Sequence, residues 1–413
     1  MNYLHVFLPR GPVEINKVAG GSERVCLAWW EALVNDNTDN NHYLYSFTHE
    51  TKDSPKIHEN HIVTSILCGK KGRISRIGPE IQQIIVDRRI DVLVNHAFTD
   101  GKKMNNMCKT LMPYSCNKKL NIINIFHMSA QIALVECPFP GMKDWYLDHD
   151  NYRATAPGRV NTVMMTNSDF AKATYTMEAK KIPPIPIPFV DFNNGFFSFC
   201  FENPKQEVKS STGDIMMIGR TDKMKRIPET LKFLTDYKGG DIHIFTKHND
   251  YAADAILNRI LKQEKLYEHV KVHVGMPRDE MFKIAANCKA FISGSYKETG
   301  PITMLEVGEL GVPSVLAFSN DFENKYPAET ILKDISHYSY NVDLLNDNPD
   351  TLLDIINEIP EDLEFRKQIQ KGIFDKLHVN DFPNKWYAMI DEIVKPENYN
   401  KFCLPAVETN SLF

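Results

Sequence analysis

The sequence lacks a long apolar run and lacks paired cysteines. No stretch of about 18 consecutive apolar residues occurs, so a transmembrane helix is not expected. The apolar start of the chain is too short for a signal peptide. The eight cysteines form no Cys-x-x-Cys pair, which argues against a zinc or redox motif and favours buried, reduced thiols. These absences together predict a cytoplasmic protein.

The sequence also lacks a strong excess of charge of either sign. Lys and Arg total 48 against 53 Asp and Glu, so the formal net charge is −5. This balance excludes a uniformly basic nucleic-acid coat but not a local basic face. With 43% hydrophobic and 24% charged residues the chain is neither disordered nor fibrous. At roughly 150 residues per domain, 413 residues predict two or three domains.

Short apolar runs alternate with amphipathic segments in the first part of the chain, which is typical of an α/β sheet with crossover helices. Ser22 is a candidate N-cap for the first helix. The expected strands are 3–9, 42–47, 91–95, 120–127 and 163–167, and the expected helices are 23–34, 78–89 and 170–177.

Five prolines between residues 181 and 204 interrupt this alternation and indicate a linker. The alternation then resumes, so we expect two Rossmann-like domains that face a central cleft. The predicted boundaries are 1–190 for the N-terminal domain, 191–213 for the linker, 214–380 for the C-terminal domain, and 381–413 for a helix and tail that return to the N-terminal domain. In the second half the expected strands are 214–219, 241–245, 270–274, 290–293 and 312–317, and the expected helices are 229–237, 251–264, 279–286 and 302–310.

The stretch that follows the strand 290–293 combines acidic residues with a helix start. Backbone N–H groups around Gly300, Ile302 and Thr303 would form an anion site suited to phosphate. Glu306, about one turn inside the helix, could accept hydrogen bonds from vicinal hydroxyls. The alternative interpretation is a solvated helix face formed by acidic residues, namely Glu298, Glu306 and Glu309.

A second polar segment follows the strand that ends at Gly219. Arg220 and Lys225 would place two cations at the carboxyl edge of the sheet, where they could neutralise a diphosphate leaving group. Taken alone, this segment could equally be a basic surface loop.

Several of these motifs, in order along the chain, resemble the family-4 retaining glycosyltransferases of GT-B fold. The pair Glu298-x7-Glu306 resembles their Glu-x7-Glu motif, and Gly219-Arg220 with Lys225 resembles their diphosphate clamp. Further similarities lie at Gly20-Gly21 (their Gly-Gly loop), His127 (their strand-end histidine near the transferred sugar), His96 (an earlier histidine of their cleft), Val274-Gly275, 166–168 and 188–191. The resemblance covers roughly residues 2–390. The chain departs from the family at Pro301, which has no N–H, and at Gly308 and Glu309.

The resemblance implies retaining, metal-independent transfer of a hexose or pentose from a nucleotide sugar, with a UDP-sugar as the expected donor and no cofactor. Glu298 would hold sugar hydroxyls and Glu306 the ribose, while Arg220 and Lys225 would stabilise the diphosphate. Gly21 and His127 would line the sugar site. The residues expected in catalysis are His127, Glu298, Arg220 and Lys225, and those expected to bind the donor are Gly20, Gly21, Gly219, Gly300, Ile302, Thr303 and Glu306.

The acceptor is predicted from local charge. Residues 69–119 hold eleven Lys and Arg against four Asp and Glu, whereas residues 343–364 hold eight acidic residues and no Lys or Arg. A basic acceptor side favours a polyanion, and phage DNA glucosyltransferases share the GT-B fold. Our first hypothesis is therefore a hydroxymethyl pyrimidine in phage DNA, which would place the protein in the host cytoplasm. The acceptor-side candidates are His96, Lys70, Lys71, Arg73, Lys102 and Lys103.

Other interpretations of the same residues stay open. The first alternative is a glycosyltransferase that acts on a cell-envelope glycan or lipid at an anionic membrane surface. The second is a protein that binds a nucleotide sugar or DNA without catalysis. A sugar epimerase of the same fold is a further candidate, and the cations of residues 69–119 could also be ordinary solvated helix faces.

Overall fold

The protein forms two compact units, which are described separately here. Unit 1 comprises Met1–Phe199 and Asn380–Phe413, and unit 2 comprises Cys200–Val379. The computed structural model of the chain describes residues 1–7, 21–36, 38–48, 58–65, 77–96, 121–126, 162–166, 189–190, 207–221, 225–246, 251–264, 266–295, 302–318, 338–377 and 382–394.

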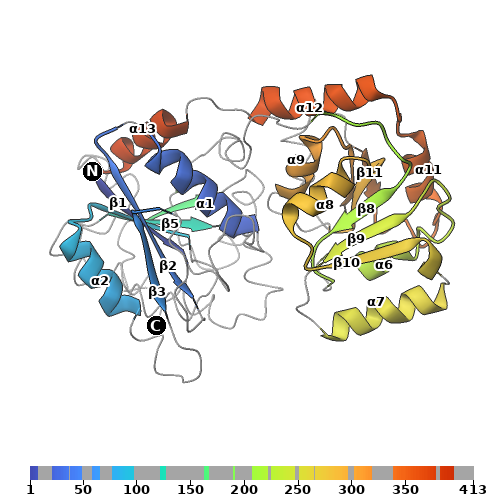
Figure 1. Cartoon of the computed structure of the whole chain (residues 1–413), viewed down its shortest axis with the longest axis horizontal. Helices are drawn as coiled ribbons and strands as arrows, with labels where there is room; N and C mark the ends of the chain where they lie inside the picture. Colours follow the sequence, from blue (N-terminus) through green and yellow to red (C-terminus); the bar gives the residue numbers. More distant parts are fainter. Residues whose placement is uncertain are drawn as a thin grey trace, which may run out of the picture. The chain divides into compact units, whose positions relative to one another are not determined.

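Unit 1 is built on a parallel sheet with strand order β3-β2-β1-β4-β5-β6-β7 (Figure 1). Every neighbouring pair is parallel, which requires crossover connections and buries both faces. The strands are β1 (Asn2–Phe7), β2 (Asn41–Thr48), β3 (His61–Ser65), β4 (Val92–Asn95), β5 (Asn121–Phe126), β6 (Thr162–Thr166) and β7 (Phe189–Val190).

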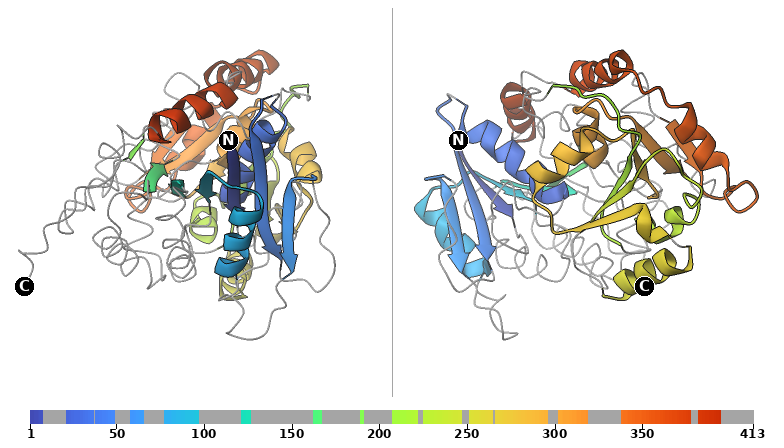
Figure 2. Two further views of the ribbon diagram at one scale, coloured as in Figure 1. Left: turned by 90° about the vertical axis from the view of Figure 1, so that its left-hand side faces the viewer. Right: turned by 45° about the vertical axis from the view of Figure 1, so that its right-hand side comes forward.

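Helices cover both faces of this sheet. On one face, α1 (Gly21–Val34) packs the side chains of Leu27 and Trp30 against Leu44 of β2. α13 (Phe382–Val394), the C-terminal helix, lies beside α1 on the same face (Figures 1 and 2). On the other face, Glu80 of α2 (Ile77–Asp87) accepts a hydrogen bond from the Tyr45 hydroxyl.

Unit 2 repeats the pattern with a six-stranded sheet of order β10-β9-β8-β11-β12-β13, again parallel throughout. Counted along the chain within each unit, both sheets follow the 3-2-1-4-5-6 order of the Rossmann fold. The strands are β8 (Ile215–Ile218), β9 (Ile242–Thr246), β10 (Val270–Val274), β11 (Ala290–Ser293), β12 (Ser314–Phe318) and β13 (Tyr338–Asn341).

The core of unit 2 lies between one face of its sheet and three helices. Ile215, Met217, Ile242, Ile244 and Ile292 point to this face and are almost wholly buried. They pack against α6 (Ile227–Leu231), α7 (Tyr251–Gln263) and α11 (Thr351–Glu358), which also contribute to the cluster. The remaining elements are η5 (Leu266–Glu268), α8 (Arg278–Ala285), α9 (Ile302–Gly308) and α12 (Leu363–Leu377).

The α/β class with two parallel sheets confirms the prediction from the sequence. The sequence did not predict β3, β7, β13, α11 and α12, and the bounds of two helices were wrong. α1 begins at Gly21, so Ser22 lies inside the helix rather than capping it. α6 ends at Leu231 instead of residue 237, because the backbone N–H groups of Phe233 and Leu234 donate to carbonyl oxygens three residues back and form tighter turns. The helix expected at 170–177 lies outside the described residues.

Candidate active site

The carboxyl ends of β8 and β11 form the candidate site of unit 2. These strands are neighbours in the sheet, although β9 and β10 lie between them in the sequence. The strand order therefore reverses between β8 and β11, and open α/β sheets bind ligands outside the carboxyl ends of the strands at such a point. Gly219 and Arg220 follow β8, and Gly294 and Ser295 follow β11.

Gly219 and Lys225 lie against each other at the end of β8. A methyl group on Gly219 would lie 3.3 Å from Cγ and 3.4 Å from Cδ of Lys225, so the aliphatic part of the lysine passes over the glycine backbone. Lys225 is half-buried, whereas Arg220, also on this loop, is exposed. The structure thus brings Gly219 and Lys225, two of the three residues predicted for the diphosphate clamp, into contact. The third residue, Arg220, directly follows Gly219 in the sequence.

Gly294, which follows β11, lies against the start of α6. A methyl group at this position would collide with Oγ1 of Thr230 and would lie 3.1 Å from the carbonyl oxygen of Arg226. The backbone of β11 can therefore approach the start of α6 only because residue 294 has no side chain. Tyr340 of β13 also binds the end of β11, since its hydroxyl donates to the carbonyl oxygen of Ser293 over 3.3 Å. Burial raises the pKa of Tyr340 to about 12, so this donor keeps its proton at neutral pH.

Glu306 is a buried carboxylate on α9. Its exposed fraction is 7%, which excludes the solvated helix face as an interpretation of this residue. Its Oε1 atom lies 2.9 Å from Nη2 of Arg278, at the start of α8. The guanidinium carbon of Arg278 lies 4.2 Å from the centre of the Phe282 ring. A buried carboxylate needs a close positive charge, and Arg278 supplies it.

Sequence reasoning missed Arg278. Its position carried a signal nevertheless, because it is the first residue of α8 and follows Pro277 at the N-cap. The positive end of the helix dipole disfavours a cation there. An arginine in this place is better tolerated when a carboxylate lies close to its guanidinium group, and here that carboxylate is Glu306.

α12 packs against the end of α9. Ile373 packs so closely that a methyl group on Gly308 would lie 2.8 Å from its Cγ1 atom. Nε2 of Gln370 donates to the carbonyl oxygen of Glu309 over 2.6 Å. Gly311, with φ of +75°, follows this segment in the left-handed conformation typical of a glycine at a helix C-terminus. The departures from the family pattern at 308 and 309 thus lie at the contact with α12.

In unit 1 the strand order reverses between β1 and β4. His96 comes directly after β4, at the carboxyl end, and its side chain is 4% exposed. Its ring lies 5.7 Å from that of Trp29, a residue of α1. Gly21, predicted in the donor loop, is the first residue of α1, which follows β1.

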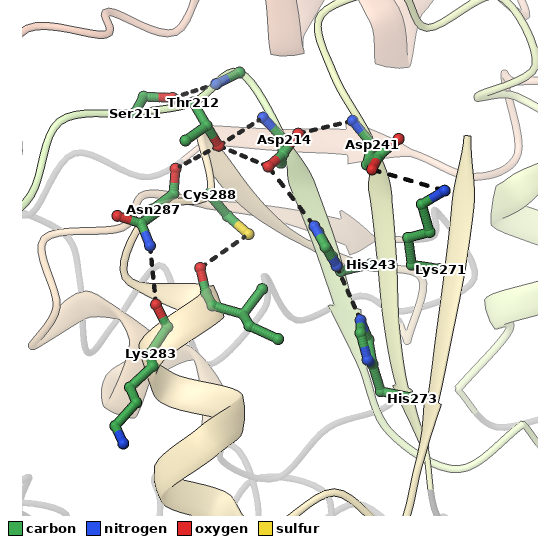
Figure 3. A network of polar contacts seen from close by, with 12 residues as sticks. Ser211, Thr212, Asp214, Asp241, His243, Lys271, His273, Lys283, Asn287 and Cys288 are labelled. Carbon is green, nitrogen blue, oxygen red and sulfur yellow. Dashed lines mark hydrogen bonds and ion pairs between the residues drawn. The ribbon is translucent and has the colours of Figure 1, made fainter. Parts of the chain in front are cut away.

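A second polar cluster in unit 2 begins at the opposite edge of the sheet (Figure 3). Asp214 directly precedes β8, and its Oδ1 atom accepts a hydrogen bond from the backbone N–H of Asp241, before β9. Nε2 of His243 lies 3.7 Å from Oδ2 of Asp214, and Nδ1 of His243 lies 2.9 Å from Nε2 of His273. Burial and the nearby His243 lower the pKa of His273. Because this network starts at the amino ends of the strands, we assign it a structural role.

Several predicted residues lie outside the part of the chain that the structure describes. For Ile302 the backbone is described as the first residue of α9, and Thr303 follows it as a half-buried residue. The predicted residues outside the described ranges are His127, Glu298, Gly20, Gly300, Lys70, Lys71, Arg73, Lys102 and Lys103.

The described ranges contain no cluster of three or more His, Cys, Asp or Glu side chains that could hold a metal ion. Within the same ranges, no helix combines the length and the apolar character needed to cross a membrane.

Comparison with protein-family models found no match, and comparison with curated protein sequences found none either. Solved structures do match over almost the whole chain. Sucrose-phosphate synthase from Thermosynechococcus elongatus superposes with a TM-score of 0.68 at 9% identity, over 95% of this chain and 98% of that one.

Two further structures match over similar lengths. HepE from Anabaena, in complex with UDP and glucose, has a TM-score of 0.62 at 11% identity, over 95% of this chain and 100% of that one. WaaG, a glycosyltransferase involved in lipopolysaccharide biosynthesis, has a TM-score of 0.61 at 12% identity, over 94% of this chain and 99% of that one. At these identities the matches show the fold, which is the GT-B fold that the sequence resemblance implied.

Proposed function

We propose that the protein is a retaining glycosyltransferase that moves a sugar from a nucleotide sugar to a hydroxyl acceptor. One observation carries the proposal. The GT-B fold places Gly219 with Lys225 at the end of β8, while Glu306 lies buried on α9, beyond the end of the neighbouring strand β11. A donor bound at this edge would meet cations suited to its diphosphate and a carboxylate suited to its ribose.

In the proposed reaction the bond between the anomeric carbon and the diphosphate oxygen breaks, and a bond from that carbon to the acceptor oxygen forms. The hydroxyl proton passes to the leaving phosphate on the same face of the sugar, so no covalent protein intermediate is needed. Arg220 and Lys225 would stabilise the charge that develops on the diphosphate. Glu298 and His127, by resemblance, would hold the transferred sugar.

Arg278 has an indirect part in this proposal. Glu306 can accept two ribose hydroxyls only if its carboxylate keeps one orientation. The 2.9 Å contact with Arg278 Nη2 fixes the position of one carboxylate oxygen. We therefore treat Arg278 as a positioning residue of the donor site.

The donor we propose is a UDP-sugar, since HepE has been solved with UDP and glucose and its fold matches over 95% of this chain. The test measures turnover of each of a panel of nucleotide sugars by the amount of nucleoside diphosphate released. Lys225→Ala should lower turnover by at least tenfold, because one charge-assisted contact to the leaving group is lost. Lys232→Ala, on the exposed surface after α6, is the matched control and should keep full activity.

Glu298→Ala tests the sugar site in the same assay. Loss of transfer with an unchanged unfolding curve supports the assignment, whereas full activity removes Glu298 from the site. A protein that binds nucleotide sugars without turning any of them over would be a binding protein. Release of free sugar without an acceptor would identify an epimerase or hydrolase.

The acceptor we favour is a glycan or lipid of the cell envelope, because WaaG takes part in lipopolysaccharide biosynthesis. The basic stretch 69–119 would then face the anionic groups of such an acceptor. Because DNA is also a polyanion, the positive charge of this stretch makes hydroxymethylated duplex DNA a second candidate acceptor.

The two acceptors are separated by binding and transfer measured at several salt concentrations. DNA binding that weakens steeply with salt, together with sugar transfer to hydroxymethylated bases, would support the DNA acceptor. Transfer to lipid-linked or envelope glycan without transfer to DNA would support the envelope acceptor.

A further inference from the structure

A buried arginine on α12 binds the C-terminal end of α8. The side chain of Arg366 is 1% exposed. Its Nη1 atom donates to the carbonyl oxygen of Cys288 over 3.0 Å, and its Nη2 atom donates to that of Ala286 over 2.7 Å. Between them, the carbonyl oxygen of Asn287 accepts from the backbone N–H of Thr212 over 2.9 Å. The three carbonyl groups that follow α8 are therefore all satisfied, two of them by one guanidinium group.

Among the described residues, this arginine has no acidic partner. Its guanidinium group donates to the two backbone carbonyl oxygens, and within the same part of the chain its Nε atom is buried without a hydrogen-bond partner. Burial of a cation is costly unless a counter-charge lies close, and the negative end of the α8 dipole offsets only part of that cost. A methionine has a similar length and no charge to bury. What arginine adds at this position is a pair of directed hydrogen bonds to α8.

The same face of α12 also binds the end of α9. Gln370 and Ile373 lie four and seven positions after Arg366, which places the three side chains on one face of the helix. Gln370 donates to the carbonyl oxygen of Glu309, directly after α9, and Ile373 packs against Gly308, the last residue of α9. One helix therefore contacts the C-terminal ends of both α8 and α9.

An ion pair also joins the start of α12 to the connection between α8 and β11. Oε1 of Glu361 lies 2.7 Å from Nζ of Lys289. The Glu361 side chain is 50% exposed, so water and salt screen this pair. Arg366 is therefore the buried contact between α12 and this connection, and the ion pair is the solvated one.

The length of α8 links its C-terminal end to the donor site. Arg278, its first residue, lies 2.9 Å from Oε1 of Glu306 on α9. A helix of eight residues is about 12 Å long, so a rotation of about 5° at its C-terminal end moves its start by about 1 Å. A shift of that size takes the two atoms beyond hydrogen-bonding distance. A small movement at one end of α8 is thus enough to break the contact at the other.

We propose that Arg366 is a positioning residue of the donor site: it fixes α8 to α12, and through α8 it sets the contact between Arg278 and Glu306. Because α12 also binds the end of α9, both members of the pair are located against one helix. Replacement of Arg366 loosens α8 and leaves α9 in place. The effect on the pair is a property of the fold, whereas its consequence for ribose binding rests on the proposed function.

The first test compares the interaction between Arg278 and Glu306 in two backgrounds. Urea unfolding of the full-length protein with Arg278→Gln, Glu306→Gln, both or neither gives the coupling between the two side chains. The same four proteins are then made with Arg366→Met. We expect the second coupling to be less than about half of the first, because α8 no longer holds Arg278 in one place.

Lys367→Met is the matched control, since it removes an exposed cation from the next position of α12 with the same replacement. Its coupling should equal that of the native protein. An unchanged coupling in Arg366→Met would overturn the proposal and leave Arg366 with a structural role alone. If Arg366→Met does not fold, Arg366→Lys takes its place, because lysine keeps the charge and loses the paired geometry. An unchanged coupling in that variant would contradict the proposal equally.

Donor kinetics test the consequence for the site. Arg366→Met should raise the KM for the nucleotide sugar by about fivefold or more and change kcat by less than about twofold. Arg366→Lys should recover part of the loss, and Lys367→Met should lose nothing. In a Glu306→Gln background, Arg366→Met should raise the KM by less than about twofold, because the contact through which it acts is already gone.

A full rise of the KM in that background would contradict the route through Glu306. A protein that turns over no nucleotide sugar would contradict the proposed glycosyl transfer instead. The unfolding measurements need no substrate, so they decide the positioning role of Arg366 in either case.

Discussion

At the scale of single residues, Arg278 and Glu306 form the pair on which the proposed donor site depends. Arg278→Gln leaves a carboxylate that is 7% exposed without its cation. We expect the free energy of unfolding of unit 2 to fall by about 1–3 kcal/mol. Urea denaturation followed by circular dichroism measures this loss. The KM for the donor should rise more than kcat falls, because ribose binding is affected before chemistry.

The control for this prediction is Lys283→Gln, which removes an exposed charge from the same helix and should change stability by less than about 0.5 kcal/mol. The double variant Arg278→Gln with Glu306→Gln should lose less stability than the two single losses added, since no unpaired buried charge remains. Strict additivity would show that the pair does not interact.

Gly311 and Gly275 offer a matched pair of glycines with positive φ. Their φ values are +75° and +63°, so alanine costs about 1–2 kcal/mol of backbone strain at either position. A methyl group at 311 would also lie 2.7 Å from the carbonyl oxygen of Arg366, whereas nothing lies within 4 Å of one at 275. Gly311→Ala should therefore destabilise by an additional 1–3 kcal/mol or so. Thermal unfolding compares the two, and equal losses would argue against the α12 contact.

The sequence predicts those site residues that lie close together along the chain in a recognisable pattern. Gly219 and Lys225 are recognisable because a glycine and a cation follow a strand end within a few residues. Arg278 and Glu306 lie 28 positions apart in the sequence and meet only because the fold brings the start of α8 to α9. Sequence spacing does not contain that contact, although the unfavourable place of Arg278 in the helix dipole hints at it.

At the scale of elements, the buried histidines of β1 and β2 make unit 1 sensitive to acid. The pKa values of His5 and His42 fall from 6.5 in the unfolded chain to about 3 and about 2 in the fold. Protons then bind the unfolded state more strongly, so stability present above pH 6.5 is lost as the pH falls towards 3. Each histidine contributes a slope of about 1.4 kcal/mol per pH unit in this range.

Urea denaturation between pH 7 and pH 5 measures this slope. All four tryptophans, at positions 29, 30, 145 and 386, belong to unit 1, so their fluorescence reports on that unit. His42→Gln should remove about half of the slope, and His269→Gln, an exposed residue of unit 2, should leave it unchanged. A slope that is independent of His42 would contradict the assigned burial effect.

Elements with strong periodicity are predicted well from the sequence. β8, β10, β11 and α7 lie within one or two residues of the expected bounds, because apolar runs between turn signals define them. β13 and α11 were missed, since their neighbourhood is acidic and its apolar side chains are buried only by contact with the unit 2 core. The parallel strand order follows from the alternation of strands and helices rather than from any single residue.

At the scale of the whole molecule, unit 1 depends on a segment from the far end of the chain. Trp386 of α13 is wholly buried against Trp29 and His5. Removal of residues 380–413 should therefore abolish the cooperative tryptophan fluorescence transition of unit 1. Unit 2, which is continuous in sequence, should keep its own transition by circular dichroism. An unchanged fluorescence midpoint in the truncated protein would contradict this dependence.

The discontinuity of unit 1 also sets an order of assembly during synthesis. β7, the last strand of its sheet, ends at residue 190, and α13 begins at residue 382. A ribosome that adds about 5–20 residues per second needs on the order of 10–40 s to cover that interval. Throughout this time the nascent first unit exposes the apolar surface that α13 later covers. The unit that starts first is thus completed last, when α13 has left the ribosome.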